Sequence, residues 1–352
     1  MTDVQYQTAL SLFDQGRLAE GAQLLGQAAQ GGHVPAMSLL GGQLLSGRGA
    51  PLDPIAGVRL IMTAAERGGG FACTMAATLL AAGVAGRPDW VRALDYLRRG
   101  AELGFPPAQA QLRLLAGRDG DDWRVLRRSI DIKTWRAAPK PTVLSGSPRV
   151  RAFEGVASPA ICDWIIARGQ GRLRPAMVYD AAGRNAVSNV RGNSAAELSL
   201  LDVDLVMLAV RERLGAAAGL PVMHMDAPQV LHYAVGQSFT PHVDFFDPAI
   251  PSQAADMAAN GQRVATALIY LNDEGLEGGE TDFPALGLRH RGAKGDALVF
   301  FNVEPSGQPD RRTLHAGLAP TGGEKWLLSQ WIRDRAPAGV GDPQLVAAVN
   351  GR

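Results

Sequence analysis

A step of 36 residues recurs through the first third of this chain. Three glycines and three alanines keep this step: Gly32, Gly68, Gly104, Ala36, Ala72 and Ala108. Glycine is enriched just past the ends of helices, and small side chains let two helices approach closely. A fixed step of this length is typical of stacked helix pairs that bury their apolar faces only against their neighbours. We therefore expect residues 1–120 to form an all-α helical-repeat solenoid.

Two stretches of this region, residues 21–32 and 57–69, resemble Sel1-like repeats, which are relatives of the tetratricopeptide class. The resemblance covers about residues 5–118. Two roles remain open for so short a solenoid. The first is purely structural: the solenoid packs on the rest of the chain or holds a dimer together. The second is binding, in which its concave face holds a protein partner or substrate.

The pattern changes after the repeats. Pro139 and Pro141 disfavour a helix, so residues 121–147 are expected to be a linker. Ser158 and Pro159 then predict the start of a helix, and residues 198–218 predict another. Period-two strands are expected at residues 148–153, 229–234, 239–244, 265–271, 280–283, 297–302, 314–318 and 326–333.

Many short strands without helices between them indicate a sandwich or a barrel. We expect residues 148–336 to form an α+β double-stranded β-helix, or jelly roll, with the helices covering one face. Residues 337–352 are expected to be a C-terminal tail. The whole chain is thus predicted to be multidomain.

Four residues in the last third fit a metal site beside an anion site. His242 and Asp244 are two apart in an expected strand, so they project from one face. A jelly roll can bring His315, on a later strand, beside them. Two imidazoles and one carboxylate can hold three positions of an octahedral metal, as in non-haem iron(II) oxygenases. Lys325 begins an apolar strand and is costly to bury without an anion. Each residue alone could be structural, and their joint occurrence favours the site.

From Arg151 onward the chain resembles the prolyl 4-hydroxylase family of iron(II)/2-oxoglutarate dioxygenases. The matching stretches are residues 230–244, 267–273, 277–284, 294–302 and 314–333. The ten-residue gap between His315 and Lys325 is the family's own spacing. Other oxygenase groups use arginine in place of this lysine.

The resemblance implies a role for each matching side chain. The implied Fe(II) ligands are His242, Asp244 and His315. Lys325 would bind the 5-carboxylate of 2-oxoglutarate by a charge-assisted contact. Tyr233 and Thr281 match positions that hydrogen-bond this co-substrate, although sheet packing is an alternative role for Thr281. The resemblance also implies O2 as oxidant and ascorbate as an accessory reductant.

The implied reaction is hydroxylation of an unactivated carbon, with release of succinate and CO2. The carboxylate of Asp244 leaves no place for halide, which argues against a halogenating relative. The expected substrate is a prolyl residue of a peptide or protein, partly held by the repeats. Two alternatives stay open: hydroxylation of a free amino acid or small metabolite, and an inactive oxygenase fold that serves as an interaction module.

Other residues are weaker candidates for substrate contacts. Arg191 lies where the family carries an arginine near the substrate entrance, and Trp331 falls on the Lys325 face of its expected strand. Core packing is the alternative role for Trp331. Residues 247–263 are long for a jelly-roll connection, so they are expected to be either a substrate-covering lid or a plain loop.

Composition narrows the remaining classes. Lys and Arg total 35 against 34 for Asp and Glu, which gives a formal net charge of +1. So small a charge does not predict binding to nucleic acid or to an anionic membrane. Cys73 and Cys162 fit neither a disulfide framework nor a zinc site. No signal peptide and no apolar stretch of about 20 residues is found. We expect a soluble cytoplasmic protein.

Overall fold

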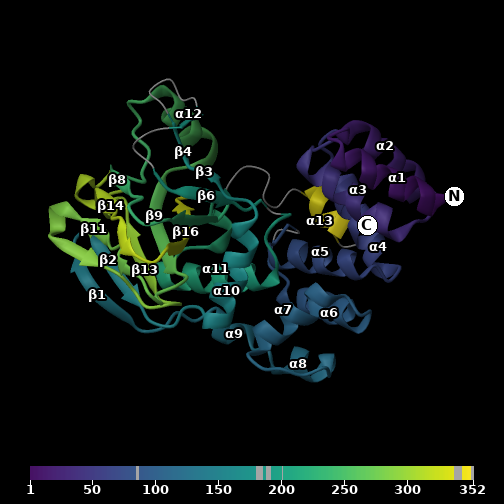
Figure 1. Ribbon diagram of the computed structural model, residues 1–352, viewed down its shortest axis with the longest axis horizontal. Coiled ribbons are helices and arrows are strands. Elements are labelled where there is room, and N and C mark those ends of the chain that lie inside the picture. Colours follow the sequence, from purple (N-terminus) through teal and green to yellow (C-terminus); the bar gives the residue numbers. More distant parts are fainter. Residues whose placement is uncertain (85–86, 180–184, 188–191, 200, 337–342, 350–352) are drawn as a thin grey trace. The chain divides into compact units, whose positions relative to one another are not determined.

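The computed structural model describes the chain except residues 85–86, 180–184, 188–191, 200, 337–342 and 350–352 (Figure 1). It divides into two compact units. The first comprises Met1–Ile132, Val203–Leu208 and Gly339–Arg352, and the second comprises Lys133–Asp202 and Ala209–Ala338. Within the described residues, no helix has the length and apolar composition that crossing a membrane requires.

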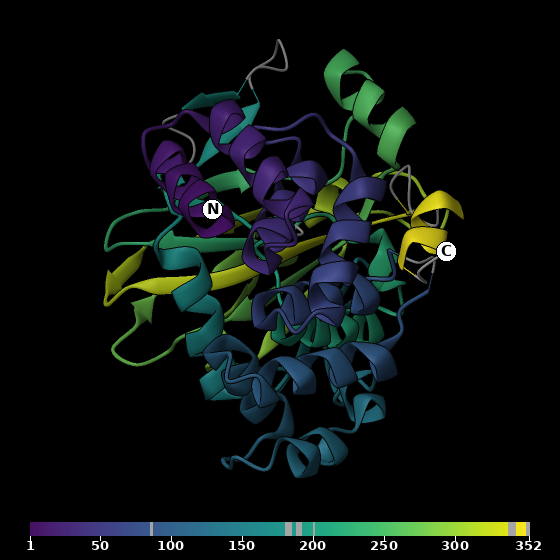
Figure 2. The same cartoon turned by 90° about the vertical axis from the view of Figure 1, so that its right-hand side faces the viewer.

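The first unit is a series of packed helices, drawn from purple to blue in Figures 1 and 2. They are α1 (Thr2–Asp14), α2 (Leu18–Gln30), α3 (Val34–Ser46), α4 (Pro54–Glu66), α5 (Gly70–Ala81), α6 (Trp90–Glu102), α7 (Pro106–Ala116) and α8 (Trp123–Ser129). The helices α2, α4 and α6 begin 36 residues apart, and so do α3, α5 and α7. Each helix packs on the next. The predicted solenoid of helix pairs is therefore confirmed.

The recurring residues begin and end these helices. The side chains of Asp53 and Asp89 accept hydrogen bonds from the third residue after them, Ala56 and Arg92, at the starts of α4 and α6. Gly32, Gly68 and Gly104 adopt positive φ angles of 85°, 87° and 78° between the two helices of each pair. A residue with a side chain rarely adopts this backbone conformation, which explains why glycine recurs there.

Glycine also allows α3 and α4 to approach closely. A Cβ at Gly57 would lie 2.8 Å from the Gly41 carbonyl oxygen, whereas a Cβ at Gly26 in α2 would meet nothing within 4 Å. We expect Gly57→Ala to lower the free energy of unfolding by about 1–3 kcal/mol through overpacking. Gly26→Ala should instead raise it by about 0.5–1 kcal/mol. Urea unfolding of both variants checks this contrast, and equal effects at the two positions would contradict it.

The second unit contains an eight-stranded antiparallel sheet, in the order β1-β2-β13-β9-β16-β7-β6-β3. Its strands are β1 (Pro141–Gly146), β2 (Arg149–Phe153), β13 (Ala297–Phe301), β9 (Arg263–Tyr270), β16 (Lys325–Arg333), β7 (Gln229–Tyr233), β6 (Ser194–Glu197) and β3 (Arg174–Pro175). A four-stranded sheet has the order β12-β11-β14-β8. Its strands are β12 (Leu288–His290), β11 (Thr281–Phe283), β14 (His315–Gly317) and β8 (Phe239–His242).

The core lies between these two sheets. Phe283 of the smaller sheet meets Phe300 of the larger one edge to face, with ring centroids 5.1 Å apart. Leu231, Leu268 and Leu327 extend the same buried cluster. On the larger sheet, helix α10 (Pro159–Gln170) packs across β6 and β7. The expected jelly roll with a helix-covered face is confirmed, as is the helix start at Ser158 and Pro159.

Most predicted strand boundaries lie within two residues of those in the structure, and two of the boundary differences have an identifiable cause. The strand expected at residues 239–244 ends at His242, because its partner strand β14 begins at His315 and residues Arg311–Thr313 before it form a 3-10 turn. The helix expected at residues 198–218 begins only at Leu205, as α11 (Leu205–Ala218). The side chain of Asp204 accepts from Met207 N and so marks that start.

Three segments contain more structure than the sequence predicted. Residues 121–147, expected to be a linker, include α8, α9 (Ile132–Trp135) and β1, and β1 pairs with β2 to extend the larger sheet. Residues 247–263 form α12 (Pro251–Asn260), which Figure 2 shows in green as a separate helix. The expected tail contains α13 (Pro343–Val349), which packs on α4 in the first unit.

The remaining elements are too short to produce a recognisable period. They are β4 (Met177–Tyr179), β5 (Asn185–Val187), β10 (Glu277–Gly278), β15 (Pro320–Gly322), η1 (Val222–His224), η2 (Pro284–Leu286) and η3 (Arg311–Thr313).

Candidate metal centre

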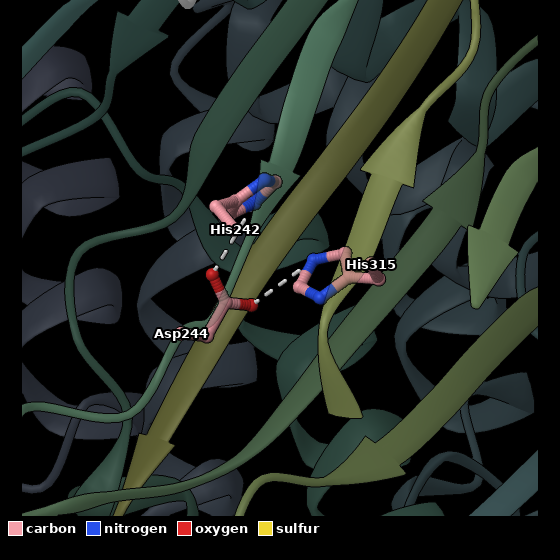
Figure 3. A group of neighbouring side chains, drawn as sticks. All are labelled: His242, Asp244 and His315. Carbon is pink, nitrogen blue, oxygen red and sulfur yellow. Dashed lines mark ion pairs between the residues drawn. The ribbon is translucent and has the colours of Figure 1, made fainter. Parts of the chain in front are cut away.

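The two histidines of the predicted site lie on neighbouring strands of the smaller sheet. His242 ends β8 and His315 begins β14, and the two residues are directly paired in the antiparallel ladder. Their rings lie 4.3 Å apart. Figure 3 shows both imidazoles directed at the Asp244 carboxylate. Their Nε2 atoms lie 3.7 Å from its two oxygens, His242 from Oδ1 and His315 from Oδ2.

Backbone carbonyls fix which nitrogen of each imidazole faces inward. Nδ1 of His242 lies 2.8 Å from the Thr240 carbonyl oxygen, and Nδ1 of His315 lies 3.0 Å from that of Thr313. A carbonyl only accepts, so each Nδ1 must carry the hydrogen. In the neutral ring this leaves the Nε2 lone pair free to bind a metal. Phe239 stacks on the His242 ring at 3.5 Å and further restricts its orientation.

Asp244 is buried and accepts a 2.7 Å hydrogen bond from the hydroxyl of Thr266. Burial would raise the pKa of this carboxyl. His315, His242 and the Thr266 hydrogen bond act against burial and hold the pKa below its ordinary value. The carboxylate form is the one that can bind a metal. Among the described residues, His242, Asp244 and His315 form a group whose ligand atoms all lie within 4.8 Å of one another.

Lys325 lies in the pocket that opens beside this group. It begins β16 and is 1% exposed, and its Nζ has no hydrogen-bond partner in the part of the chain that the structure describes. Burial lowers the pKa of Lys325 from its ordinary value of 10.5 to about 7. A buried ammonium without a hydrogen-bond partner is costly, so an anion in the pocket would relieve that cost.

The pocket is narrow, with a cavity volume of about 30 Å³. Its wall includes four alternate residues of β16, because alternate side chains of a strand share a face: Lys325, Leu327, Ser329 and Trp331. The metal-binding group lies at the same pocket. The structure therefore brings the predicted metal site and anion site together.

The other predicted residues divide into three cases. Tyr233 and Thr281 are each 2% exposed and line the pocket, and the Tyr233 ring centroid lies 4.9 Å from Lys325 Nζ. Trp331 also lines the pocket, and the Arg263 guanidinium covers its ring at 3.6 Å. Arg191 lies outside the described residues.

Comparisons with known proteins agree with this geometry. Residues 228–333 match the family model of the 2OG-Fe(II) oxygenase superfamily. Prolyl 4-hydroxylase 1 of Arabidopsis thaliana is 31% identical over 258 residues, which cover 66% of this chain and 86% of that protein. The chain belongs to the prolyl 4-hydroxylase family of 2OG-Fe(II) oxygenases. Probable prolyl 4-hydroxylase 7 of the same plant is 35% identical over 210 residues, or 54% of this chain and 64% of that protein.

Two solved structures show a partial similarity to this chain, each with a low TM-score. The viral collagen prolyl hydroxylase of Paramecium Bursaria Chlorella virus-1 is 26% identical, with a TM-score of 0.41, and the match covers 52% of this chain and 95% of that one. A Sel1 repeat protein from Oxalobacter formigenes is 20% identical, with a TM-score of 0.31, over 39% of this chain and 61% of that one.

Membership of the prolyl 4-hydroxylase family implies Fe(II), 2-oxoglutarate and O2, so this chain is a 2-oxoglutarate-dependent dioxygenase. The sequence did not reveal Phe239, Thr266 or Asn302, whose side chains support the metal-binding group. A single polar residue such as Thr266 in an apolar β-strand gives no signal of its own. Only the pairing of strands shows which buried polar groups meet.

Proposed function

We propose that this oxygenase hydroxylates a prolyl residue of a peptide or protein. In this proposal His242, Asp244 and His315 bind Fe(II), and Lys325 binds the 5-carboxylate of 2-oxoglutarate. Tyr233 and Thr281 complete the co-substrate site. The single observation that carries the proposal is the buried ammonium of Lys325, which has no hydrogen-bond partner among the described residues and lies beside two imidazoles and a carboxylate. The names of the plant relatives support prolyl hydroxylation.

The donor set fits Fe(II). Two neutral imidazoles and one carboxylate on one side of an ion leave positions open for 2-oxoglutarate and O2. The chemistry that these groups supply when bound is decarboxylation of 2-oxoglutarate to succinate and CO2, coupled to hydroxylation of an unactivated C–H bond. The part of the protein is to position the substrate, orient the ligands and limit the access of water.

The test is peptide-dependent turnover by the full chain with Fe(II), 2-oxoglutarate and ascorbate. We expect a proline-containing peptide to increase succinate release and to gain one oxygen atom at proline, as measured by mass spectrometry. Free proline at the same concentration is the matched control. Strong stimulation by free proline with none by the peptide would contradict the proposal and favour the small-molecule alternative. Absence of any 2-oxoglutarate turnover would favour an inactive fold.

The pKa of Lys325 predicts how the affinity for 2-oxoglutarate depends on pH. An anion favours the ammonium form, so above about pH 7 binding must take up a proton. Affinity should therefore fall as pH rises, by up to about tenfold per pH unit. The KM for 2-oxoglutarate at saturating Fe(II), measured from about pH 6 to about pH 8, or one unit either side of that value, checks this. Lys325→Arg stays charged and should lose the slope, and a flat profile in the unsubstituted chain would contradict the prediction.

For the repeats we propose a role in holding a protein substrate or partner. Phe71 is 46% exposed, Leu103 is 48% exposed, and Phe71 contacts Phe105 edge to face, so apolar surface is available for a protein contact. We expect the double substitution Phe71→Glu/Leu103→Glu to weaken turnover of a protein substrate while leaving turnover of a short peptide unchanged. Equal effects on both substrates would contradict this role.

A further inference from the structure

Two hydrogen bonds in series end on the Asp244 carboxylate. The side-chain amide of Asn302 donates to the hydroxyl oxygen of Thr266 at 3.0 Å, and this hydroxyl donates to Asp244 Oδ2 at 2.7 Å. Asn302 is 0% exposed and Thr266 is 1% exposed. The two hydrogen bonds are therefore shielded from solvent. Hydrogen bonds to a charged group are stronger in the protein interior than in water.

The chemistry of the three groups fixes the direction of these bonds. A hydroxyl has one hydrogen, and an ionised carboxylate can only accept. The hydrogen of Thr266 must therefore point to Asp244, and its oxygen must accept from another donor. The amide of Asn302 is that donor. Asn302 is itself held by its backbone, which donates to the Val264 carbonyl and accepts from the Asp310 amide.

Strand pairing cannot position Asp244 in the way that it positions the two histidines. His242 and His315 are paired within the smaller sheet, but β8 ends at His242 and Asp244 lies in a bend beyond it. Thr266 is in the middle of β9 in the larger sheet, where it pairs with Phe300 and Trp331. The Asp244 carboxylate is thus hydrogen-bonded to the larger sheet, whereas His242 and His315 belong to the smaller sheet that faces it.

We propose that Thr266 and Asn302 are positioning residues for the metal site. Thr266 holds one carboxylate oxygen of Asp244, and Asn302 acts through Thr266 by orienting its hydroxyl. This inference rests on the proposed function, because it assigns a metal ligand to Asp244. It adds two residues of the larger sheet to the side chains on which metal affinity depends.

The test uses Co(II) as the probe, with the full chain and without 2-oxoglutarate. Affinity is measured by titration, and the visible absorption of bound Co(II) reports its coordination. Thr266→Val, which removes the hydroxyl at nearly constant shape, should weaken Co(II) binding about 10–100-fold and alter the spectrum. Thr266→Ser, which keeps the hydroxyl, should restore both. Thr78→Val removes a buried hydroxyl that bonds to Thr74 in the repeats, so it should change neither.

A double-substitution cycle separates positioning from general stability. Asn302→Leu should weaken Co(II) binding by less than Thr266→Val does. In the Thr266→Val background, Asn302→Leu should have no further effect, because its route to Asp244 is already lost. Independent, additive losses would overturn the role of Asn302 through Thr266. Thr266→Ala provides a second variant without the hydroxyl if the valine variant does not fold.

The outcomes distinguish this inference from the proposed function. If Asp244→Ala abolishes Co(II) binding while Thr266→Val and Thr266→Ala bind as tightly as the unsubstituted chain, the positioning role is wrong and the metal site stands. If the unsubstituted chain binds no Co(II), or Asp244→Ala binds it normally, both are overturned.

Discussion

Asp244→Ala is expected to abolish Fe(II) binding and peptide hydroxylation. The substitution leaves two imidazoles and removes the only anionic ligand of the group. Loss of a supporting residue around a metal typically costs 10–100-fold in affinity, so loss of a ligand should cost more than about 100-fold. Anaerobic Fe(II) titration and hydroxylation of a proline-containing peptide measure the two effects.

Asp282→Ala is the matched control for this substitution. Asp282 lies on β11 in the same sheet as the histidines, but its carboxylate pairs with Arg289 and does not line the pocket. We expect this variant to bind Fe(II) normally. Normal Fe(II) binding by Asp244→Ala would mean that the buried carboxylate is structural, and the proposed metal site would have to be abandoned.

Lys325→Met should change ligand binding and stability in opposite directions. A hydrogen bond to a charged group contributes about 1.5–3 kcal/mol, so 2-oxoglutarate affinity should fall by roughly 10–150-fold at constant Fe(II) affinity. The substitution also removes a buried ammonium that has no hydrogen-bond partner among the described residues. The ligand-free protein should therefore gain about 1–4 kcal/mol in its free energy of unfolding.

The two effects are measured by 2-oxoglutarate titration of the Fe(II)-loaded protein and by thermal unfolding without ligand. Lys294→Met is the control, since Lys294 pairs with Asp163 away from the pocket and should not affect 2-oxoglutarate. If Lys325→Met binds 2-oxoglutarate as well as the unsubstituted chain, the carboxylate contact must lie elsewhere. Lower stability of the ligand-free variant would contradict the account of Lys325 as a strained charge.

The parts of this fold that could be predicted are those with a long or paired signal. The 36-residue step predicted the stacked helix pairs, because capping aspartates and left-handed glycines recur at it. The metal-binding group could be predicted because His242, Asp244, His315 and Lys325 occur together in stretches that resemble the prolyl 4-hydroxylase family. The expected strand geometry was not the reason, since β8 ends at His242 and Asp244 lies in a bend beyond it.

The remainder depends on contacts that a single sequence does not contain. The strand expected to reach Asp244 ends at His242, and this end is set by a turn about 70 residues further along the chain, at Arg311–Thr313. β1 was expected to be part of a linker because Pro139 and Pro141 disfavour a helix, and only the pairing of β1 with β2 makes it part of the sheet. Thr266 and Asn302 are separated by 36 residues and meet because β9 and β13 are neighbours.

The metal-binding group takes its imidazoles from the smaller sheet, whereas its carboxylate is anchored to the larger one. An ion held by all three would thus act as a crosslink between the two layers of the core. Metal binding should then reduce local opening between the two sheets. Amide hydrogens of β8, β14 and the middle of β9 would exchange more slowly together, as a single cooperative block.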